Sequence, residues 1–88
     1  MSALLSRADE ISMAAASALE HGDPAEALRL INRRFGHPLI APGARDFLLR
    51  ARAYQLAGQN AAASRDIEAA RRIAPLDPMV LAWALKGG

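Results

Sequence analysis

The chain has 88 residues, enough for one domain and too few for two. It contains no cysteine, which excludes disulfides, thiolate metal sites and a cysteine nucleophile. Eleven basic residues stand against nine acidic ones, and the formal net charge of +2 describes a near-balanced surface rather than a nucleic-acid-binding footprint.

The composition favours helices. Of all residues, 52% are hydrophobic, and many of these are alanine, which favours helix and lets helices approach closely. Runs of β-branched residues, typical of strands, do not occur. No run of about 18 apolar residues exists, and Asp9 and Glu10 interrupt the apolar N-terminal segment, so we expect neither a membrane-spanning helix nor a signal peptide. We therefore expect an all-α protein of the cytoplasm.

The first two predicted helices cover residues 2–21 and 24–35. A capping box of Ser6 and Asp9 would start the regular part of the first near residue 7. Gly22 suits a left-handed helix end, Asp23 an N-cap, and Pro24 the first position of the next helix, with Glu26 completing a capping box. Helical spacing predicts that the second helix buries Ala27, Leu28, Ile31 and Phe35.

Three more helices are expected after a linker that two prolines keep non-helical, residues 37–43. The third covers residues 44–57 and ends before Gly58. The fourth covers residues 60–73 and ends before Pro75. The fifth, residues 78–86, begins at a second Asp-Pro pair. The predicted buried stripes are Phe47, Ala51 and Tyr54 on the third helix, and Ala63, Ile67 and Ala70 on the fourth.

The chain also repeats itself at a spacing of 36 residues. Gly22 then coincides with Gly58, and the boundaries of the two helix pairs coincide as well. Residues 44–77 resemble a 34-residue tetratricopeptide repeat, with the diagnostic residues at the family's spacing: Phe47, Ala51, Tyr54, Gly58, Ala63, Ile67, Ala70 and Pro75. Arg50 stands where that family usually has leucine, and we expect its stem to be buried at the rim with its charge in water. Arg34 stands where a small residue is usual.

This resemblance implies an all-α fold, a right-handed α-α superhelix of two helical hairpins plus a C-terminal capping helix. A single domain would hold repeat one at about 8–42, repeat two at about 44–77, and a partial third unit at 78–88. About three such repeats are usually needed for stability. The first helix could cap one open end and the fifth helix the other. Otherwise a second copy or a longer protein would cover them, and the chain's end at residues 86–88 favours the longer protein.

The resemblance also implies a function, protein–protein interaction as a scaffold or adaptor. First helices of each pair would line a concave groove that receives a peptide or a helix. The candidate peptide-binding residues are Ser12, Ala16, Arg45, Leu48, Arg52, Gln55 and Lys86, with Leu19, Met79 and Ala82 on the same face. Its cations suit an acidic peptide. The alternative, that the arginines are ordinary solvated surface residues, stays open.

Other functions have less support. The serines lie in no nucleophile elbow, no phosphate loop exists, and the two histidines lack metal-ligand spacing, so we expect no enzyme, cofactor or metal. His21 is expected to bond the carbonyls at its helix end. An accessory segment of a larger enzyme, such as a transferase, is the runner-up.

Nucleic-acid binding would use a strip of arginines on the second helices of the pairs: Arg29, Arg33, Arg34, Arg65, Arg71 and Arg72. Acidic residues interrupt this strip, so a salt-bridged helix face is the better interpretation. The last helix is apolar on nearly all faces, so its free surface is expected to bind a second copy or a missing next helix. We predict a homodimer through Val80, Leu81, Trp83 and Leu85, with Trp83 as the anchor.

Overall fold

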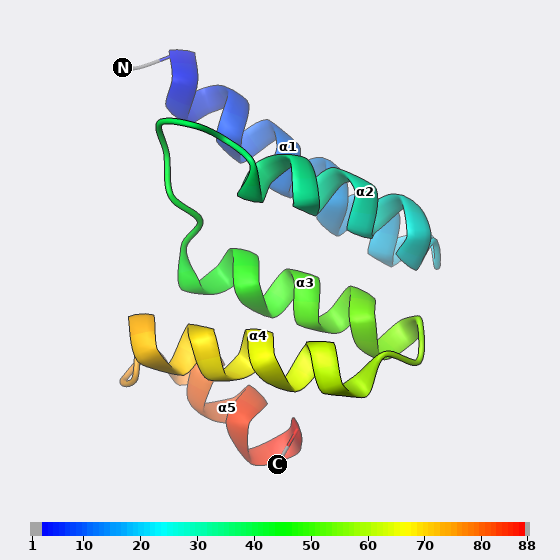
Figure 1. Ribbon diagram of the computed structural model, residues 1–88, viewed down its shortest axis with the longest axis vertical. Coiled ribbons are helices and arrows are strands. Elements are labelled where there is room, and N and C mark those ends of the chain that lie inside the picture. Colours follow the sequence, from blue (N-terminus) through cyan, green and yellow to red (C-terminus); the bar gives the residue numbers. More distant parts are fainter. Residues whose placement is uncertain (1–2, 88) are drawn as a thin grey trace.

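A computed structural model describes the backbone of residues 3–87 and the side chains of residues 7–83 and 85. This part of the chain holds five helices and no strand (Figure 1): α1 Ala3–Glu20, α2 Pro24–Phe35, α3 Ala44–Leu56, α4 Asn60–Ile73 and α5 Pro78–Gly87. The all-α prediction is confirmed. The bounds of α2 and α4 are those that the sequence predicts, and the outer limits of the predicted ranges 2–21, 44–57 and 78–86 lie within one residue of the observed bounds.

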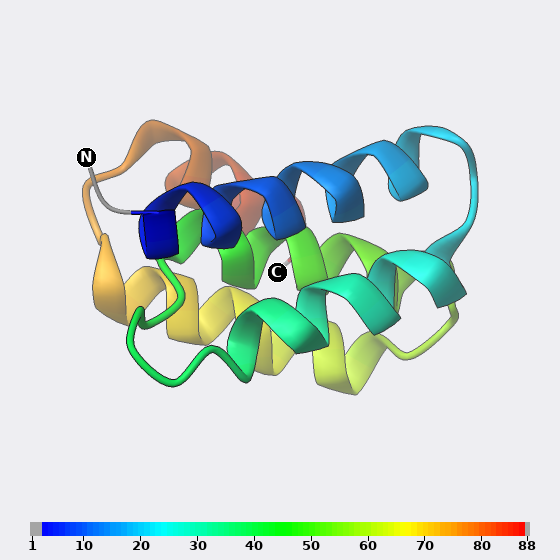
Figure 2. The same cartoon turned by 90° about the horizontal axis from the view of Figure 1, so that it is seen from above.

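The helices form two antiparallel pairs and a single last helix (Figures 1 and 2). The most extensive packing joins α1 to α2 and α3 to α4. Between the pairs, α3 packs against both α2 and α1, and α5 packs in the same way against α4 and α3. The described residues extend over 37 × 29 × 19 Å. Among them, no helix is long and apolar enough to cross a membrane.

Local signals explain where α2 begins. Gly22 has a φ of 74°, and the Asp23 carboxylate accepts a bond of 3.1 Å from the Glu26 backbone N–H. Glu26 does not complete the predicted capping box, because its carboxylate accepts bonds of 2.6 and 2.7 Å from Arg29 instead. These bonds lower the pKa of Glu26. The predicted start of α1 near residue 7 is wrong, since the helix already begins at Ala3.

The turn between α3 and α4 depends on Gly58. Its φ of 79° lies in the left-handed region, where the Gly58 N–H donates to the Gln55 carbonyl at 3.0 Å. The next N–H, of Gln59, donates to the Tyr54 carbonyl at 2.8 Å. Both bonds satisfy carbonyls at the end of the helix, and a residue with a Cβ would strain this conformation.

We therefore expect Gly58→Ala to lower the free energy of unfolding by about 1 kcal/mol, the cost of left-handed backbone for a residue with a Cβ. A Cβ at Gly58 would meet nothing within 4 Å, so crowding adds no cost. The control is Gly36→Ala, where φ is −81° and the free energy should stay unchanged or rise by about 0.4–1 kcal/mol. Urea denaturation measures both, and equal effects would contradict this account.

Small residues form most of the core between the helices. A buried cluster in the second half contains Ala44, Leu48, Ala51, Ala63, Ile67, Ala70 and Val80, and Phe47, Tyr54, Ala74 and Trp83 pack against it. The predicted stripes of the third and fourth helices thus lie in or against the core. Ala15 in the first pair is buried like Ala51 in the second. Alanine at these positions lets paired helices approach closely, so little apolar volume holds the fold together.

Arg50 does not leave its charge in water as the sequence suggested. Its Nε and Nη2 both donate to the Asp66 carboxylate at 2.8 Å, and its Nη1 donates to Asn32 at 3.1 Å. The guanidinium also lies 3.8 Å above the centre of the Phe35 ring, a cation–π geometry. The bonds to Asp66 raise the pKa of Arg50. One side chain therefore ties α2, α3 and α4 together.

Removing the buried partner of this pair should destabilise the fold. Asp66 is 4% exposed, and Asp66→Ala would leave the Arg50 charge partly buried without its two-bond acceptor. We expect the free energy of unfolding to fall by about 2–3 kcal/mol, less than for a fully buried pair because Arg50 is partly hydrated. Glu26→Ala removes a solvent-exposed ion pair and should cost clearly less. Urea titrations followed by circular dichroism test the difference, and equal losses of unfolding free energy would contradict this role of Asp66.

Arg34 is the second inward arginine, in a position where a small residue was expected. It is 5% exposed, and its Nη1 and Nη2 donate to the carbonyls of Ile40 and Ala41 at 2.8 and 2.9 Å. Its Nη2 also lies 3.5 Å from the Asp46 carboxylate. The linker before α3 is therefore fastened to the end of α2, and Arg34 is unavailable to an external ligand.

Candidate binding groove

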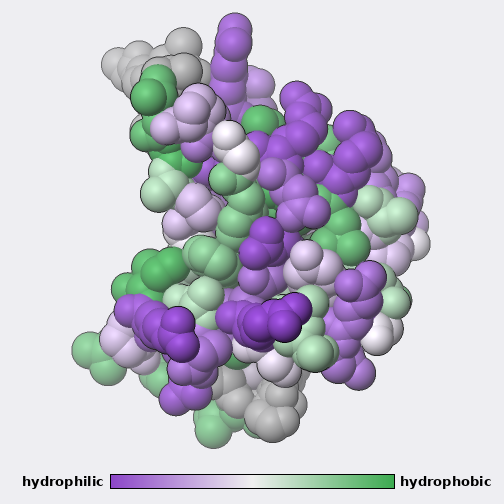
Figure 3. Space-filling view, in the orientation of Figure 1, coloured by the Kyte–Doolittle hydropathy of each residue, from purple (hydrophilic) through white to green (hydrophobic). Residues whose placement is uncertain are grey.

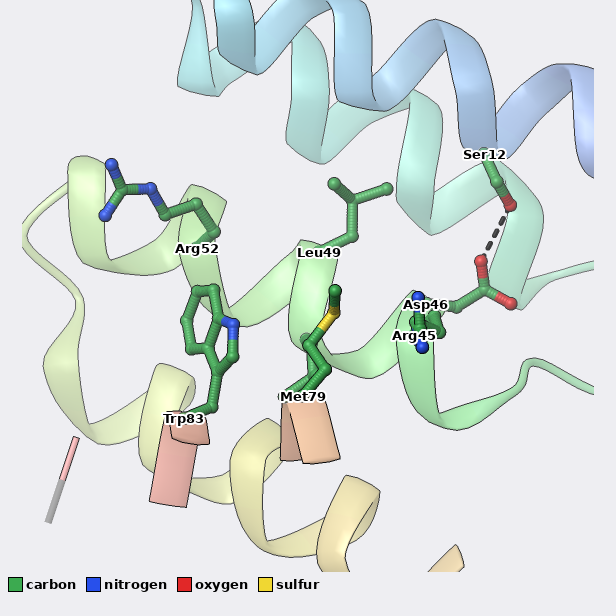
Figure 4. Close-up of a pocket in the computed structure, with 8 residues that line it drawn as sticks. Ser12, Arg45, Asp46, Leu49, Arg52, Met79 and Trp83 are labelled. Carbon is green, nitrogen blue, oxygen red and sulfur yellow. Dashed lines mark hydrogen bonds between the residues drawn. The ribbon is translucent and has the colours of Figure 1, made fainter. Parts of the chain in front are cut away.

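A groove opens where α1, α3 and α5 meet, on the side formed by the first helix of each pair. Its volume is about 310 Å³ (Figure 4), and it is lined by Ser12, Arg45, Asp46, Leu48, Leu49, Arg52, Met79 and Trp83. Three helices far apart in the sequence supply these side chains, so the groove exists only when the two pairs and α5 are stacked.

The floor of the groove is apolar. Leu48 belongs to the core cluster, and Trp83 packs against that cluster. Met79 and Trp83 are four residues apart on α5, so they lie on the same face of this helix. In Figure 4, both side chains and that of Leu49 point into the space between the helices. An apolar side chain of a partner would lose water on entering here, which favours binding.

One carboxylate of the groove is already satisfied. Asp46 accepts a bond of 2.7 Å from the Ser12 hydroxyl, which Figure 4 shows as a dashed line, and one of 2.9 Å from the Gly43 N–H. The Arg34 guanidinium lies 3.5 Å from the same carboxylate. Asp46 therefore joins α1, the end of α2 and the start of α3, and it presents little uncompensated negative charge to a ligand.

The remaining charge of the groove is positive. Arg45 lies 3.6 Å from the Asp77 carboxylate, and its side chain is 66% exposed. Arg52 is exposed, and it forms no ion pair with any side chain that the structure describes. Figure 4 places Arg52 beside Trp83 at the edge of the apolar floor. The groove thus combines an apolar floor with a cation that has no partner among the described residues.

Of the seven residues that the sequence assigns to peptide binding, four line this groove: Ser12, Arg45, Leu48 and Arg52. Ala16 and Gln55 are half-buried on α1 and α3 without lining it, and the side chain of Lys86 lies outside the described residues. Asp46, Leu49 and Trp83 line it as well, and Met79 was already predicted on this face. Trp83 could have been assigned to the groove from the sequence, because it lies four residues after Met79 and therefore on the same face of the helix.

The residues predicted for self-association do not lie on one surface. Val80 is fully buried in the core cluster, so it cannot touch a second copy, and this part of the prediction is wrong. Trp83 is half-buried and faces the groove. Leu81 and Leu85 are 46% and 87% exposed. The reason is geometric: α5 turns the face of Val80 toward α3 and α4, and the sequence alone did not show which face that would be.

The two histidines have structural partners. The Nδ1 of His21 lies 2.7 Å from the Ser17 carbonyl at the end of α1, as predicted for this side chain. His37 Nδ1 accepts bonds of 3.1 Å from the backbone N–H groups of both Leu39 and Ile40. Among the described residues, no three His, Cys, Asp or Glu side chains form a group that could hold a metal ion.

Ion pairs interrupt the arginine strip. Arg29 pairs with Glu26 and Arg71 with Glu68, while Arg34 is buried. Figure 3 shows hydrophilic residues gathered over the upper right, where Figure 1 places α2. Two of the six arginines of the strip thus form ion pairs on their own helices and a third is buried, which is in line with the interpretation that the sequence favours.

Comparison with known proteins adds no relative to this picture. No family model matches the chain, and neither a curated protein nor a solved structure matches it.

The contacts of Asp46 with Ser12, Gly43 and Arg34 should be essential to the stacking that forms the groove. Asp46→Ala removes the acceptor of Ser12 and Gly43 and leaves the buried Arg34 charge without its carboxylate. We expect the free energy of unfolding to fall by about 2–3 kcal/mol. Asp9→Ala is the control, an exposed aspartate on α1 whose loss should cost about 0.5 kcal/mol or less. Urea denaturation measures both, and a loss at Asp46 as small as the control would contradict this role.

Proposed function

We propose that this chain is a helical repeat module similar to tetratricopeptide repeats, and that it binds a peptide segment of another protein without catalysing a reaction. The two antiparallel pairs and α5 would form a right-handed superhelix, with α1, α3 and α5 on its concave side. The repeated packing supports this proposal, because α3 meets α1 and α2 as α5 meets α3 and α4. The groove also lies among these three helices.

The observation that carries the proposal is Arg52 beside the apolar floor. A guanidinium binds a carboxylate through two parallel hydrogen bonds, so a glutamate or aspartate of the partner is the natural counterpart. Leu49, Met79 and Trp83 would receive a bulky apolar residue near that acid. We therefore propose an acidic peptide with at least one large apolar side chain as the ligand.

The dimensions of the groove agree with such a ligand. A volume of about 310 Å³ is at the lower end of the range of roughly 300–1,000 Å³ that is usual for small-molecule pockets. The groove is open along one side and built from helix faces. A short segment of a partner would therefore place one or two side chains in it while the rest of the partner stays outside.

The test begins with a phage-displayed library of random peptides selected on the wild-type chain. We expect the selected peptides to be enriched in acidic and large apolar residues. Binding of a synthetic selected peptide should change the emission of Trp83, the single tryptophan, which lines the groove. Arg52→Glu should raise the dissociation constant at least about tenfold, because attraction to the carboxylate becomes repulsion.

Arg65→Glu is the matched control, since it makes the same charge change at an exposed position on α4 away from the groove. It should change the dissociation constant less than about threefold. The proposal fails if the selected peptides lack acidic residues, if Trp83 emission does not respond, or if the two variants weaken binding equally.

A further inference from the structure

The last helix occupies the place of a first helix in a pair, but no second helix covers it among the described residues. It packs on α3 and α4 as α3 packs on α1 and α2. At the spacing of 34 residues that separates Pro78 from Ala44, Leu81 corresponds to Phe47 and Leu85 corresponds to Ala51. In α3, these two positions face the core that α4 closes.

Burial at these corresponding positions differs sharply. Ala51, and Ala15 at the same position of the first pair, are both 0% exposed, whereas Leu85 is 87% exposed. Leu81 is 46% exposed, and Leu76 in the preceding turn is 85% exposed. Leu81 and Leu85 therefore stand in water in positions where a repeat stack buries apolar surface, and Leu76 is exposed as well.

A shallow pocket of about 200 Å³ adjoins Leu81, between the end of α4 and α5. Glu68, Arg71, Arg72, Pro75 and Leu81 line it. The same surface thus contains protruding apolar side chains and a recess, and it contains both an acid and arginines. A two-fold interface can use this combination, because a residue of one patch that lies away from the axis meets a different residue of the identical patch.

We propose that a second copy of this chain covers this face, related to the first by a two-fold axis. Leu85 of each copy enters the recess of the other. The Glu68 carboxylate, which already pairs with Arg71 of its own copy at 3.2 Å, also faces Arg72 of the other copy. Glu68 and Arg72 are one helical turn apart on α4, so two antiparallel α4 segments crossing between them place each acid beside an arginine.

In this arrangement the interface includes the end of α4 as well as α5. A stable interface takes about 800 Å² from each partner, which is about a seventh of the 5523 Å² surface of this chain. The end of α4 with its ionic residues must therefore contribute beside the leucines of α5. Met79 and Trp83 face the groove from another side of α5, so both copies keep their grooves open.

Sedimentation of the purified chain at increasing concentration tests the proposal. We expect the mean mass to rise from 9.4 kDa toward twice that value. Leu85→Glu should raise the dimer dissociation constant at least about tenfold, because a charge replaces the apolar anchor. Leu39→Glu is the control, the same substitution at a 70% exposed leucine in the linker, and it should leave dimerisation unchanged. A chain that stays monomeric up to about 1 mM overturns the proposal.

Charge reversal tests the two-fold pairing itself. Glu68→Arg and Arg72→Glu should each weaken dimerisation about tenfold, because each variant places like charges opposite one another. An equimolar mixture of the two variants should recover wild-type association to within about threefold, since both contacts in the mixed dimer are then attractive. A mixture that associates no better than either variant alone overturns the pairing, and so does a Leu39→Glu effect equal to that of Leu85→Glu.

Discussion

The guanidinium of Arg50 between Asp66 and the Phe35 ring is the contact on which the stacking of the two helix pairs depends. The helices of each pair meet through alanines such as Ala15, Ala51 and Ala63, which permit close approach but supply little apolar surface. A chain of this size has little stability to lose. Directional contacts between the pairs therefore decide how the pairs are arranged. Arg50 provides two of them, to Asn32 and to the Phe35 ring on α2, while Asp66 of its own pair holds the guanidinium in place.

A second set of polar contacts fixes the other side of the same junction. Asp46 receives bonds from Ser12 on α1 and Gly43 before α3, and Arg34 at the end of α2 approaches it. Breaking one partner of such a set leaves the others desolvated and unpaired, which is costlier than the loss of one surface pair. The angle between α1 and α3, and with it the width of the groove, is held by this network. The contacts that hold the candidate binding site in shape are therefore the same contacts that stabilise the fold.

The helix boundaries could be predicted because they depend on residues within one turn. The polar contacts between helices could not be predicted, because their partners are far apart in the sequence. Glycine, proline and aspartate act within one turn of a helix boundary, so α2 and α4 could be placed to the residue. The partner of Arg50 is 16 residues away on another helix, and no spacing rule identifies it. Helical spacing, applied to the inner face that the family resemblance implies, gave seven candidate peptide-binding residues, and four of them line one groove. It missed the burial of Val80 because an all-apolar helix has no polar face to indicate its orientation.

The groove and the proposed dimer face both include residues of α5, and together they would affect how tightly a partner binds. Met79 and Trp83 belong to the groove, whereas Leu81 and Leu85 belong to the face proposed for the second copy. A dimer formed through that face would carry two grooves at a fixed separation. A partner with two acidic segments would then bind the second groove as an intramolecular event, and its overall affinity would exceed that of either segment. Each small groove would bind weakly, but a dimer of this chain would hold a repetitive or dimeric partner firmly. Dimerisation would then raise the affinity for that partner without changing any contact inside the groove.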